Sequence, residues 1–254
     1  MLALSADREW IGCLLGKRGT EILPGEAIPL RNKVETFCAW GGVVAALGFG
    51  LSLVSAHFLP PISPALSAAE VKAVFLDNTS GIKVGAIIML AALTGFLTLY
   101  VGISLQIRRM NGAFSRQWSM VQLALGGFSL VPVYTTALCW ALAAYRPDRS
   151  PEAIQLLNDI AWFNLVMPVT PALVQMWAIG FATLSDHGDR LVYPRWYGFV
   201  AFWVGVLLMT GLLVPFFTVG LFAWNGLLAF WLPAVALGTF VLLTTILMLR
   251  AARM

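Results

Sequence analysis

The residues of this chain that could bind a metal or transfer protons are few and widely separated. Only two histidines, His57 and His187, occur among its 254 residues. Copper and di-iron oxygenase sites need several histidines and carboxylates that converge from different helices, so the sequence does not indicate such a site. A haem iron bound by His57 and a methionine is chemically feasible, although a single histidine is more often a bystander. We therefore predict no cofactor, with haem at His57 as the alternative.

Short motifs add little catalytic chemistry. The sequence DHGD at residues 186–189 offers three potential metal ligands, but Asp and Gly are typical turn residues, and we interpret the segment as a solvated turn. Phosphate-binding loops of the GxxxxGK[ST] or GxGxxG type do not occur. The cysteines have neither disulfide nor metal-site spacing: Cys13, Cys38 and Cys139. With no recognisable catalytic motif, the sequence favours a protein that is not an enzyme.

The elements that would position these residues are membrane-spanning helices. Hydrophobic residues make up 59% of the chain and charged residues only 11%, whereas soluble domains carry about 25% charged residues. A helix needs about 20 mostly apolar residues to cross a bilayer core of roughly 30 Å. Six segments reach this length, at residues 37–59, 84–107, 118–144, 160–184, 196–219 and 225–249. We predict an all-α, polytopic integral membrane protein with a six-helix transmembrane bundle.

Short interfacial helices are predicted outside these spans, in the N-terminal segment and in the first and third loops. Residues 1–36 form an N-terminal segment with an interfacial helix at 5–16, and residues 37–254 form a single six-span domain. Because Lys17 and Arg18 interrupt the apolar stretch at 10–15, we expect no secretory signal peptide. Ser67 and Glu70 have capping-box spacing, and Ser150 before Pro151 is typical of a helix start. We expect these two loop helices to end near Asp77 and Asp159.

The distribution of basic residues predicts the orientation in the cell membrane. Cytoplasmic loops carry an excess of Lys and Arg. Most basic residues lie in the N-terminus, the second and fourth loops and the C-terminus: Arg8, Lys17, Arg18, Arg31, Lys33, Arg108, Arg109, Arg116, Arg190, Arg195, Arg250 and Arg253. The other loops carry only Lys72, Lys83, Arg146 and Arg149. Both termini are therefore predicted to be cytoplasmic, and the net charge of +4 indicates attraction to anionic lipids rather than a nucleic-acid partner.

Tryptophans fit the two interfaces of such a membrane protein. Trp and Tyr are enriched where the hydrocarbon core meets the headgroups. We interpret Trp40, Trp118 and Trp196 as an inner aromatic belt. Trp140, Trp162 and Trp224 are interpreted as an outer belt.

Ionisable residues are expected to lie outside the membrane core. All 12 acidic residues fall in predicted loops or at the predicted ends of helices. Intramembrane ionisable residues are typical of proton relays and ion-coupled transporters. The sequence therefore disfavours a proton-coupled transporter or an ion pump.

Prolines and uncharged polar residues coincide in the outer half of spans three to six. The prolines, which bend membrane helices, are Pro132, Pro168, Pro171, Pro215 and Pro233. We predict a ligand cavity at this depth. The residues predicted to bind the ligand are Tyr134, Thr135, Asn164, Asp159, Gln175, Trp224 and Asn225. Asn164 and Tyr134 are the principal polar groups, with Asp159 at the mouth. The alternative is that the prolines only fit helices together and the polar groups form interhelical hydrogen bonds.

Small residues recur every four positions in the first span, at Gly42, Ala46 and Gly50. Such a face lets a second helix approach closely. The partner helix belongs either to this chain or to another subunit, and the sequence leaves both open.

Three functions are compatible with these features. The leading hypothesis is a non-catalytic membrane subunit or lipid-binding protein that contacts membrane lipids and packs with other membrane subunits or with a second copy of itself. The first alternative is a membrane enzyme acting on an apolar, isoprenoid- or sterol-like substrate at the outer interface. The second alternative is a facilitator that passes hydrophobic small molecules without ion coupling.

Overall fold

A computed structural model describes residues 24–252, and this part of the chain is all-helical, without a β-strand. Six helical segments are long and apolar enough to cross a membrane: Asn32–Ser55, Thr79–Ile107, Ser115–Tyr145, Pro151–Leu184, Arg195–Phe216 and Leu227–Ala251. The predicted all-α, six-helix bundle is therefore confirmed. The interfacial helix predicted at residues 5–16 lies outside the described residues.

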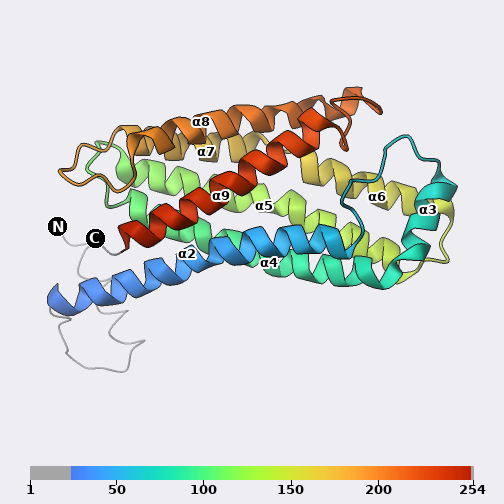
Figure 1. Ribbon diagram of the computed structural model, residues 1–254, viewed down its shortest axis with the longest axis horizontal. Helices are drawn as coiled ribbons and strands as arrows, with labels where there is room; N and C mark the ends of the chain where they lie inside the picture. Colours follow the sequence, from blue (N-terminus) through green and yellow to red (C-terminus); the bar gives the residue numbers. More distant parts are fainter. Residues whose placement is uncertain (1–23, 253–254) are drawn as a thin grey trace, which may run out of the picture.

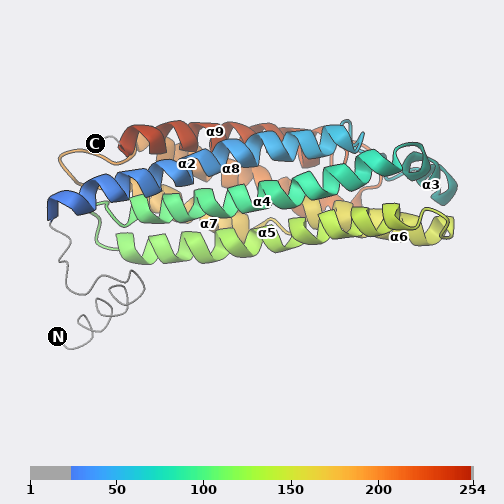
Figure 2. The same cartoon turned by 90° about the horizontal axis from the view of Figure 1, so that it is seen from below.

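The helices form an elongated bundle, and all but the short α3, which crosses one end, run along its long axis (Figures 1 and 2). They are α2 (Pro24–Ser55), α3 (Ala68–Asp77), α4 (Thr79–Ile107), α5 (Ser115–Tyr145), α6 (Pro151–Val166), α7 (Thr170–Leu184), α8 (Arg195–Leu208) and α9 (Leu232–Ala251). One end of the bundle carries the start of α2 and the end of α9, and we call it the terminal end (Figure 1). The opposite end, which carries α3, is called the distal end.

The first loop contains the predicted short helix, α3, which begins with a complete capping box. The Glu70 carboxylate accepts hydrogen bonds from the Ser67 amide (2.8 Å) and hydroxyl (2.7 Å). In return, the Glu70 amide donates to the Ser67 hydroxyl at 3.4 Å. These bonds stabilise the carboxylate and lower the pKa of Glu70. The helix ends at Asp77, as predicted, and the Asn78 side chain donates to the Ser55 carbonyl at the end of α2 (3.0 Å).

The third loop differs from the prediction, because its helix is not a separate element. Helix α6 begins at Ser150 and Pro151 as expected, with the Ser150 hydroxyl accepting from the Ala153 amide. It does not end near Asp159 but continues to Val166. Asp159 therefore lies inside a helix and within a candidate span, rather than at a helix end.

The fourth span is broken between α6 and α7, at residues 167–169. Pro168 and Pro171 have no amide hydrogen, so the carbonyls of Asn164 and Met167 lose the donors that a continuous helix would supply. The Met167 carbonyl instead accepts from the Val169 amide at 2.8 Å. The two prolines thus divide the span into two helices.

The distal parts of spans five and six are also irregular. Helix α8 continues as a 3₁₀ helix, η1 (Met209–Phe216), and α9 is preceded by a π-helical turn, η2 (Leu227–Trp231). The Thr210 hydroxyl joins the two segments by donating to the Leu228 carbonyl at 2.6 Å. The predicted spans at 196–219 and 225–249 are therefore present but only partly α-helical.

The small-residue face of α2 packs within this chain. A β-carbon on Gly42 would meet the Thr245 hydroxyl of α9, whereas Gly50 faces open space. Ala46 packs against the central hydrophobic core. The closest backbone approach uses the adjacent face, where Gly41 of α2 lies against Gly95 of α4. These contacts identify helices of the same chain as the neighbours of Gly42 and Ala46.

Enlarging Gly95 is expected to destabilise the bundle. A β-carbon there would lie 2.7 Å from the Gly41 carbonyl oxygen and 2.9 Å from the Ala45 amide nitrogen, and both are backbone atoms that cannot rotate away. We expect Gly95→Ala to lower the free energy of unfolding by about 1–3 kcal/mol, as for other overpacked sites. Gly50→Ala is the matched control and should leave stability unchanged or raised. Equal losses in the two variants, measured by denaturant unfolding in micelles, would contradict this packing.

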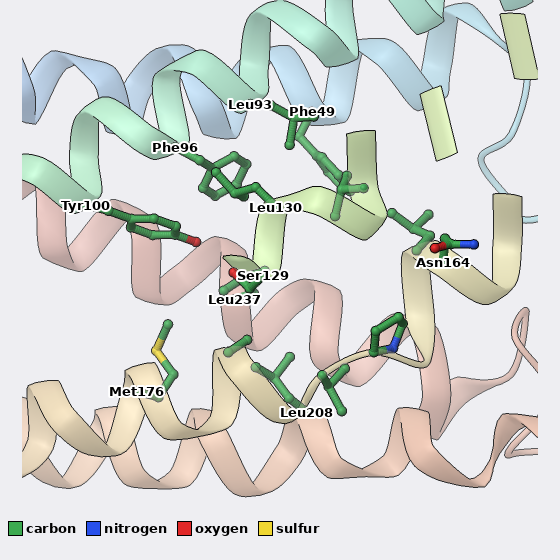
Figure 3. Close-up of a pocket in the computed structure, with 15 residues that line it drawn as sticks. Phe49, Leu93, Phe96, Tyr100, Ser129, Leu130, Asn164, Met176, Leu208 and Leu237 are labelled. Atoms are coloured by element: carbon green, nitrogen blue, oxygen red, sulfur yellow. The ribbon is translucent and has the colours of Figure 1, made fainter. Parts of the chain in front are cut away.

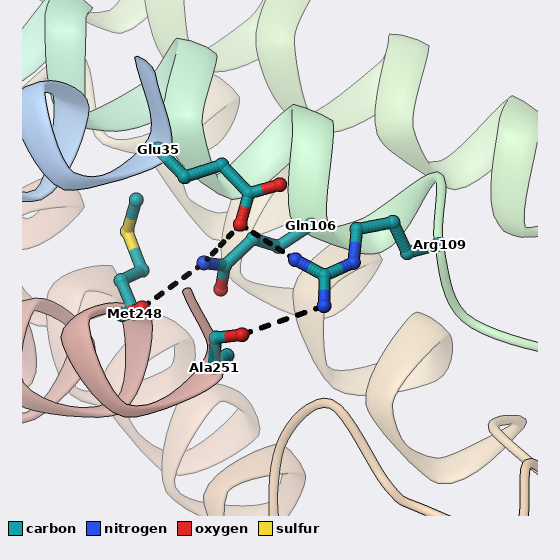
Figure 4. A network of polar contacts seen from close by, with 5 residues as sticks. All are labelled: Glu35, Gln106, Arg109, Met248 and Ala251. Atoms are coloured by element: carbon teal, nitrogen blue, oxygen red, sulfur yellow. Dashed lines mark hydrogen bonds and ion pairs between the residues drawn. The ribbon is translucent and has the colours of Figure 1, made fainter. Parts of the chain in front are cut away.

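An unexpected ion pair lies inside the bundle near its terminal end (Figure 4). Glu35 is fully buried within the first candidate span, and its Oε2 accepts from Arg109 Nη1 at 2.6 Å and from Gln106 Nε2 at 3.1 Å. Gln106 and Arg109 also donate to the carbonyls of Met248 (3.2 Å) and Ala251 (3.4 Å). This network, which we call the Glu35 clasp, ties α2 and the end of α4 to α9.

The Glu35 clasp corrects the expectation that every acidic residue lies in a loop or at a helix end. Helix α2 begins well before residue 37, where the first span was predicted to start. Glu35 also precedes buried Cys38 and Ala39 at three- and four-residue spacing, so all three lie on one helix face. Glu35 therefore points inward and not toward solvent.

A cluster of large aromatic rings fills the distal end of the bundle. Trp162 contacts Trp140, Phe58 and Phe230, with ring centroids 5.2, 5.9 and 6.0 Å away. We call these four residues the distal aromatic cluster. Trp140, Trp162 and Trp224 are all buried, so they do not form the outer interfacial belt that we predicted. The polar end of the Trp224 ring is satisfied internally, since its Nε1 donates to the Ile62 carbonyl at 2.8 Å.

Candidate ligand-binding site

A cavity of ≈120 Å³ lies inside the bundle, where the break in the fourth span opens the helix packing (Figure 3). Side chains from all six spans line it, whereas the sequence predicted spans three to six only. The lining residues are Phe49, Leu93, Phe96, Tyr100, Ser129, Leu130, Val133, Asn164, Leu165, Pro168, Val169, Ala172, Met176, Leu208 and Leu237.

A second cavity of ≈90 Å³ adjoins the first on the side of η2 and α9. The two cavities share five lining side chains: Phe49, Leu165, Val169, Leu208 and Leu237. The remainder of the second lining is also apolar and includes Phe230 and Pro233. The two cavities therefore lie next to each other beside the α6–α7 break, on either side of shared apolar side chains.

Polar groups reach the first cavity at two places. On one side, Tyr100 of α4 points its hydroxyl toward Ser129 of α5 (Figure 3), and Gln175 of α7 lies beside the same hydroxyl. The Ser129 hydroxyl donates to the Gly126 carbonyl at 2.7 Å. On the other side, the Asn164 amide donates back to the Ile160 carbonyl of its own helix at 2.8 Å.

One of the seven residues predicted to bind a ligand, Asn164, lines this cavity. Gln175 is buried outside the lining, beside the Tyr100 hydroxyl. Tyr134 and Thr135 lie on a different face of α5: the Tyr134 side chain is 46% exposed, and the Thr135 hydroxyl donates to the Val131 carbonyl of its own helix at 3.2 Å. Neither residue lines the cavity.

The other three predicted residues lie toward the distal end, away from the cavity lining. Asp159 is adjacent to Asn158, whose amide donates to its carboxylate at 3.5 Å. Trp224 is held by the Ile62 carbonyl, as described above. Asn225 is half-buried in the turn before η2. Of these three side chains, only that of Trp224 makes a hydrogen bond to a distant part of the chain that the structure describes.

Tyr100 and Ser129 were not predicted as site residues, although a signal for Ser129 is present in the sequence. Small or polar residues recur at three- and four-residue spacing along α5, at Ser115, Ser119, Gln122, Gly126 and Ser129. This spacing places them on one helix face, and the first four are buried. A polar stripe in an otherwise apolar span indicates a face turned toward protein rather than lipid. Tyr100 carries no comparable signal, because its neighbours in α4 are apolar.

The residues considered for metal or haem binding lie outside both cavities. His57 is exposed in the turn after α2, where its φ is 57°. In the DHGD segment, Asp186 organises the turn by accepting hydrogen bonds from the amides of Asn111 (3.0 Å), Gly188 (3.1 Å) and Val192 (3.1 Å). Within residues 24–252, no group of three or more His, Cys, Asp or Glu side chains is arranged to hold a metal ion.

Three comparisons with known proteins found no match to this chain: no protein-family model, no curated protein and no solved structure matches it. Its function is therefore inferred from the geometry and chemistry of the cavity itself.

Proposed function

We propose that this multi-pass membrane protein binds an apolar, lipid-like ligand in the cavity beside the α6–α7 break, without catalysing a reaction. The observation that carries the proposal is the composition of the lining, which is apolar apart from Tyr100, Ser129 and Asn164. Binding sites for small molecules are mostly apolar, contain a few placed polar groups and often form between the helices of bundles. The cavity has all three properties.

The size of the space supports occupation by part of a lipid-like molecule. An apolar protein cavity of about 150 Å³ stays free of water and binds benzene. The first cavity, at ≈120 Å³, is somewhat smaller, so it suits a small ring or a short length of alkyl chain, and a second cavity of ≈90 Å³ lies beside it. A longer molecule would leave the rest of its chain in the surrounding lipid.

Ligand binding has more structural support than service as a partner-packing subunit. The subunit hypothesis was supported by the small-residue face of the first span and by the absence of charged residues from the predicted membrane core. Gly42 and Ala46 of this face pack against the chain itself, while Gly50 faces open space. Two of the three small residues on that face thus pack against helices of the same chain, so the face does not require a second chain to cover it.

Filling the cavity is expected to remove the bound ligand. Ala172 lines the first cavity, and Ala172→Leu adds three carbon atoms to the space that the ligand would occupy. After purification in native-lipid nanodiscs, mass spectrometry should find a stoichiometric small molecule with the wild type and at least tenfold less with this variant. Ala91→Leu, on an exposed face of α4, is the matched control and should retain the molecule. Equal ligand content in all three proteins would contradict the proposal.

Facilitated passage of a hydrophobic molecule is a second candidate, favoured by the discontinuity of spans four, five and six. Transporter sites are typically formed where membrane helices are interrupted, and the α6–α7 break borders both cavities. A release assay distinguishes ligand binding from facilitated passage. Proteoliposomes are loaded with the small molecule that copurifies with the wild type, and its rate of release is measured. Release that is faster than from protein-free liposomes, and that Ala172→Leu abolishes, supports a facilitator.

We also propose that the terminal end of the bundle faces the cytoplasm of the cell. Basic residues gather at or next to the helix ends on that side, as expected for the cytoplasmic side. They are Arg108, Arg109, Arg116, Arg190, Arg195 and Arg250. In a variant without native cysteines, single cysteines at positions 67–79 should react with a membrane-impermeant maleimide added to intact cells. Cysteines at positions 185–190 should react only after the cells are opened. The reverse pattern would invert the orientation.

A further inference from the structure

The polar side of the first cavity is formed by the hydroxyl groups of two lining residues, Tyr100 and Ser129. The Ser129 hydroxyl donates to the Gly126 carbonyl. Gln175 is completely buried, lies outside the lining and meets the Tyr100 hydroxyl. The Tyr100 hydroxyl is therefore a donor that a ligand in the cavity can reach, and Gln175 positions it.

The backbone of α5 makes room for this polar group. A β-carbon on Gly126 would collide with the Gln175 amide and would lie 2.9 Å from the Tyr100 ring. Gly126 therefore allows residues from α4 and α7 to meet against α5. Ser129, one turn further along α5, completes the group, which we call the Tyr100 triad: Tyr100, Ser129 and Gln175.

The lining also limits the charge of any ligand. No Asp, Glu, Lys, Arg or His side chain of the described residues lines either cavity. A charged group placed there would lose its water without gaining a counter-ion, which is strongly unfavourable. An uncharged carbonyl or hydroxyl can instead accept a hydrogen bond from the Tyr100 hydroxyl.

We infer that the ligand is an apolar ring or chain bearing a single uncharged carbonyl or hydroxyl group, which is held by the Tyr100 triad. Its apolar part extends past Val169, Leu208 and Leu237 toward the second cavity. This inference rests on the proposed ligand-binding function and adds the chemical class of the ligand. It predicts weaker binding of a pure hydrocarbon, which cannot accept a hydrogen bond from the Tyr100 hydroxyl, and it excludes a fatty-acid carboxylate, which would bring a charge.

Three fluorinated probes of similar shape test the inference. They are 4-fluoroacetophenone, which has one carbonyl, 1-ethyl-4-fluorobenzene, which has none, and 4-fluorobenzoate, which is charged. Binding to the protein in nanodiscs is measured by ¹⁹F NMR, and the Ala172→Leu protein supplies the signal from probe dissolved in lipid. We expect the ketone to bind about five-fold more tightly than the hydrocarbon, as for one net hydrogen bond, and the carboxylate not to bind.

Removing one hydroxyl from the triad should abolish this preference. Tyr100→Phe keeps the ring and is expected to bring the ketone to the affinity of the hydrocarbon, whose own binding stays unchanged. Tyr134→Phe makes the same change on an exposed face and should keep the five-fold preference. If Tyr100→Phe does not fold, Ser129→Ala and Gln175→Leu are read in the same way, since each removes one polar group of the triad.

The outcomes separate this inference from the proposed function. Equal affinity for ketone and hydrocarbon in the wild type, or binding of the carboxylate, overturns the inference while leaving a ligand-binding cavity. A preference for the ketone that survives every triad substitution also overturns it. If no probe gives a signal beyond that of Ala172→Leu, and no small molecule copurifies with the wild type, the proposed function itself fails.

Discussion

Replacing Glu35 with alanine is expected to lower the free energy of unfolding by about 3 kcal/mol, the low end of the cost of breaking a buried ion pair, because Glu35 is fully buried while the Arg109 side chain is 23% exposed. The charge left uncompensated would be the Arg109 guanidinium, whose Nη1 lies 2.6 Å from the Glu35 carboxylate. The change also removes the acceptor of Gln106. Helix α2 would then lose its polar attachment to the end of α4 and to α9. Denaturant unfolding in micelles or bicelles measures the effect.

The ion pair has an internal control and a test of coupling. Arg108 is exposed next to Arg109, and Arg108→Ala should change the free energy of unfolding by no more than about 0.5 kcal/mol. The double variant Glu35→Ala with Arg109→Ala should lose less stability than the sum of the single losses, since it removes both charges. Strictly additive losses would show that Glu35 and Arg109 act independently, contrary to the Glu35 clasp.

Truncation of Trp162 is the second change for which a large loss is expected. Its side chain is fully buried at the centre of the distal aromatic cluster, so Trp162→Ala leaves a cavity that Trp140, Phe58 and Phe230 cannot close without moving. Substitutions of this kind cost about 3–5 kcal/mol in protein cores. We expect a loss in this range by denaturant unfolding, together with loss of the near-ultraviolet circular dichroism of the packed rings.

Trp203 provides the matched control for this substitution. It lies in α8 with 67% of its surface exposed on the outside of the bundle, where lipid or detergent replaces the lost contacts. Trp203→Ala should therefore cost less than about 1 kcal/mol. A loss as large as that of Trp162→Ala would mean that lipid-facing rings stabilise the protein as much as the distal aromatic cluster does.

The number and places of the spans could be predicted because they depend on local properties. A long apolar run identifies a membrane helix whatever its neighbours are. The capping box of Ser67 and Glu70 is equally local, since it involves residues three apart, and it is present in the structure. Helix α3 could be predicted for the same reason, down to its last residue.

Features that depend on several helices could not be predicted in the same way. The prolines at 168 and 171 predicted a bend but not a complete interruption, which also requires neighbouring segments to occupy the gap. Gly211 of η1 packs directly against the Val166 carbonyl at the end of α6. The inward position of Glu35 likewise depends on the rotation of α2 against α4 and α9.

Prediction of the candidate site was limited by the same cause. Asn164 was identified from its depth and polarity, and it lines the cavity. Tyr134 satisfies the same two criteria, but it lies on the outward face of α5. Depth along a helix can be read from the sequence, whereas the direction of a side chain around that helix depends on packing. Tyr100 was missed because its span is almost wholly apolar and its partners, Ser129 and Gln175, come from two other helices.

The break between α6 and α7 has a consequence for the synthesis of the protein. Helix α7 has 15 residues, which rise only about 22 Å, less than a hydrocarbon core of about 30 Å. Released alone into the bilayer, α7 would leave part of the core uncrossed, and its unpaired end would be exposed to lipid tails. Helices α6 and α7 therefore have to enter the bilayer as one unit, with the gap between them covered by a neighbour such as η1, whose Gly211 packs against the Val166 carbonyl.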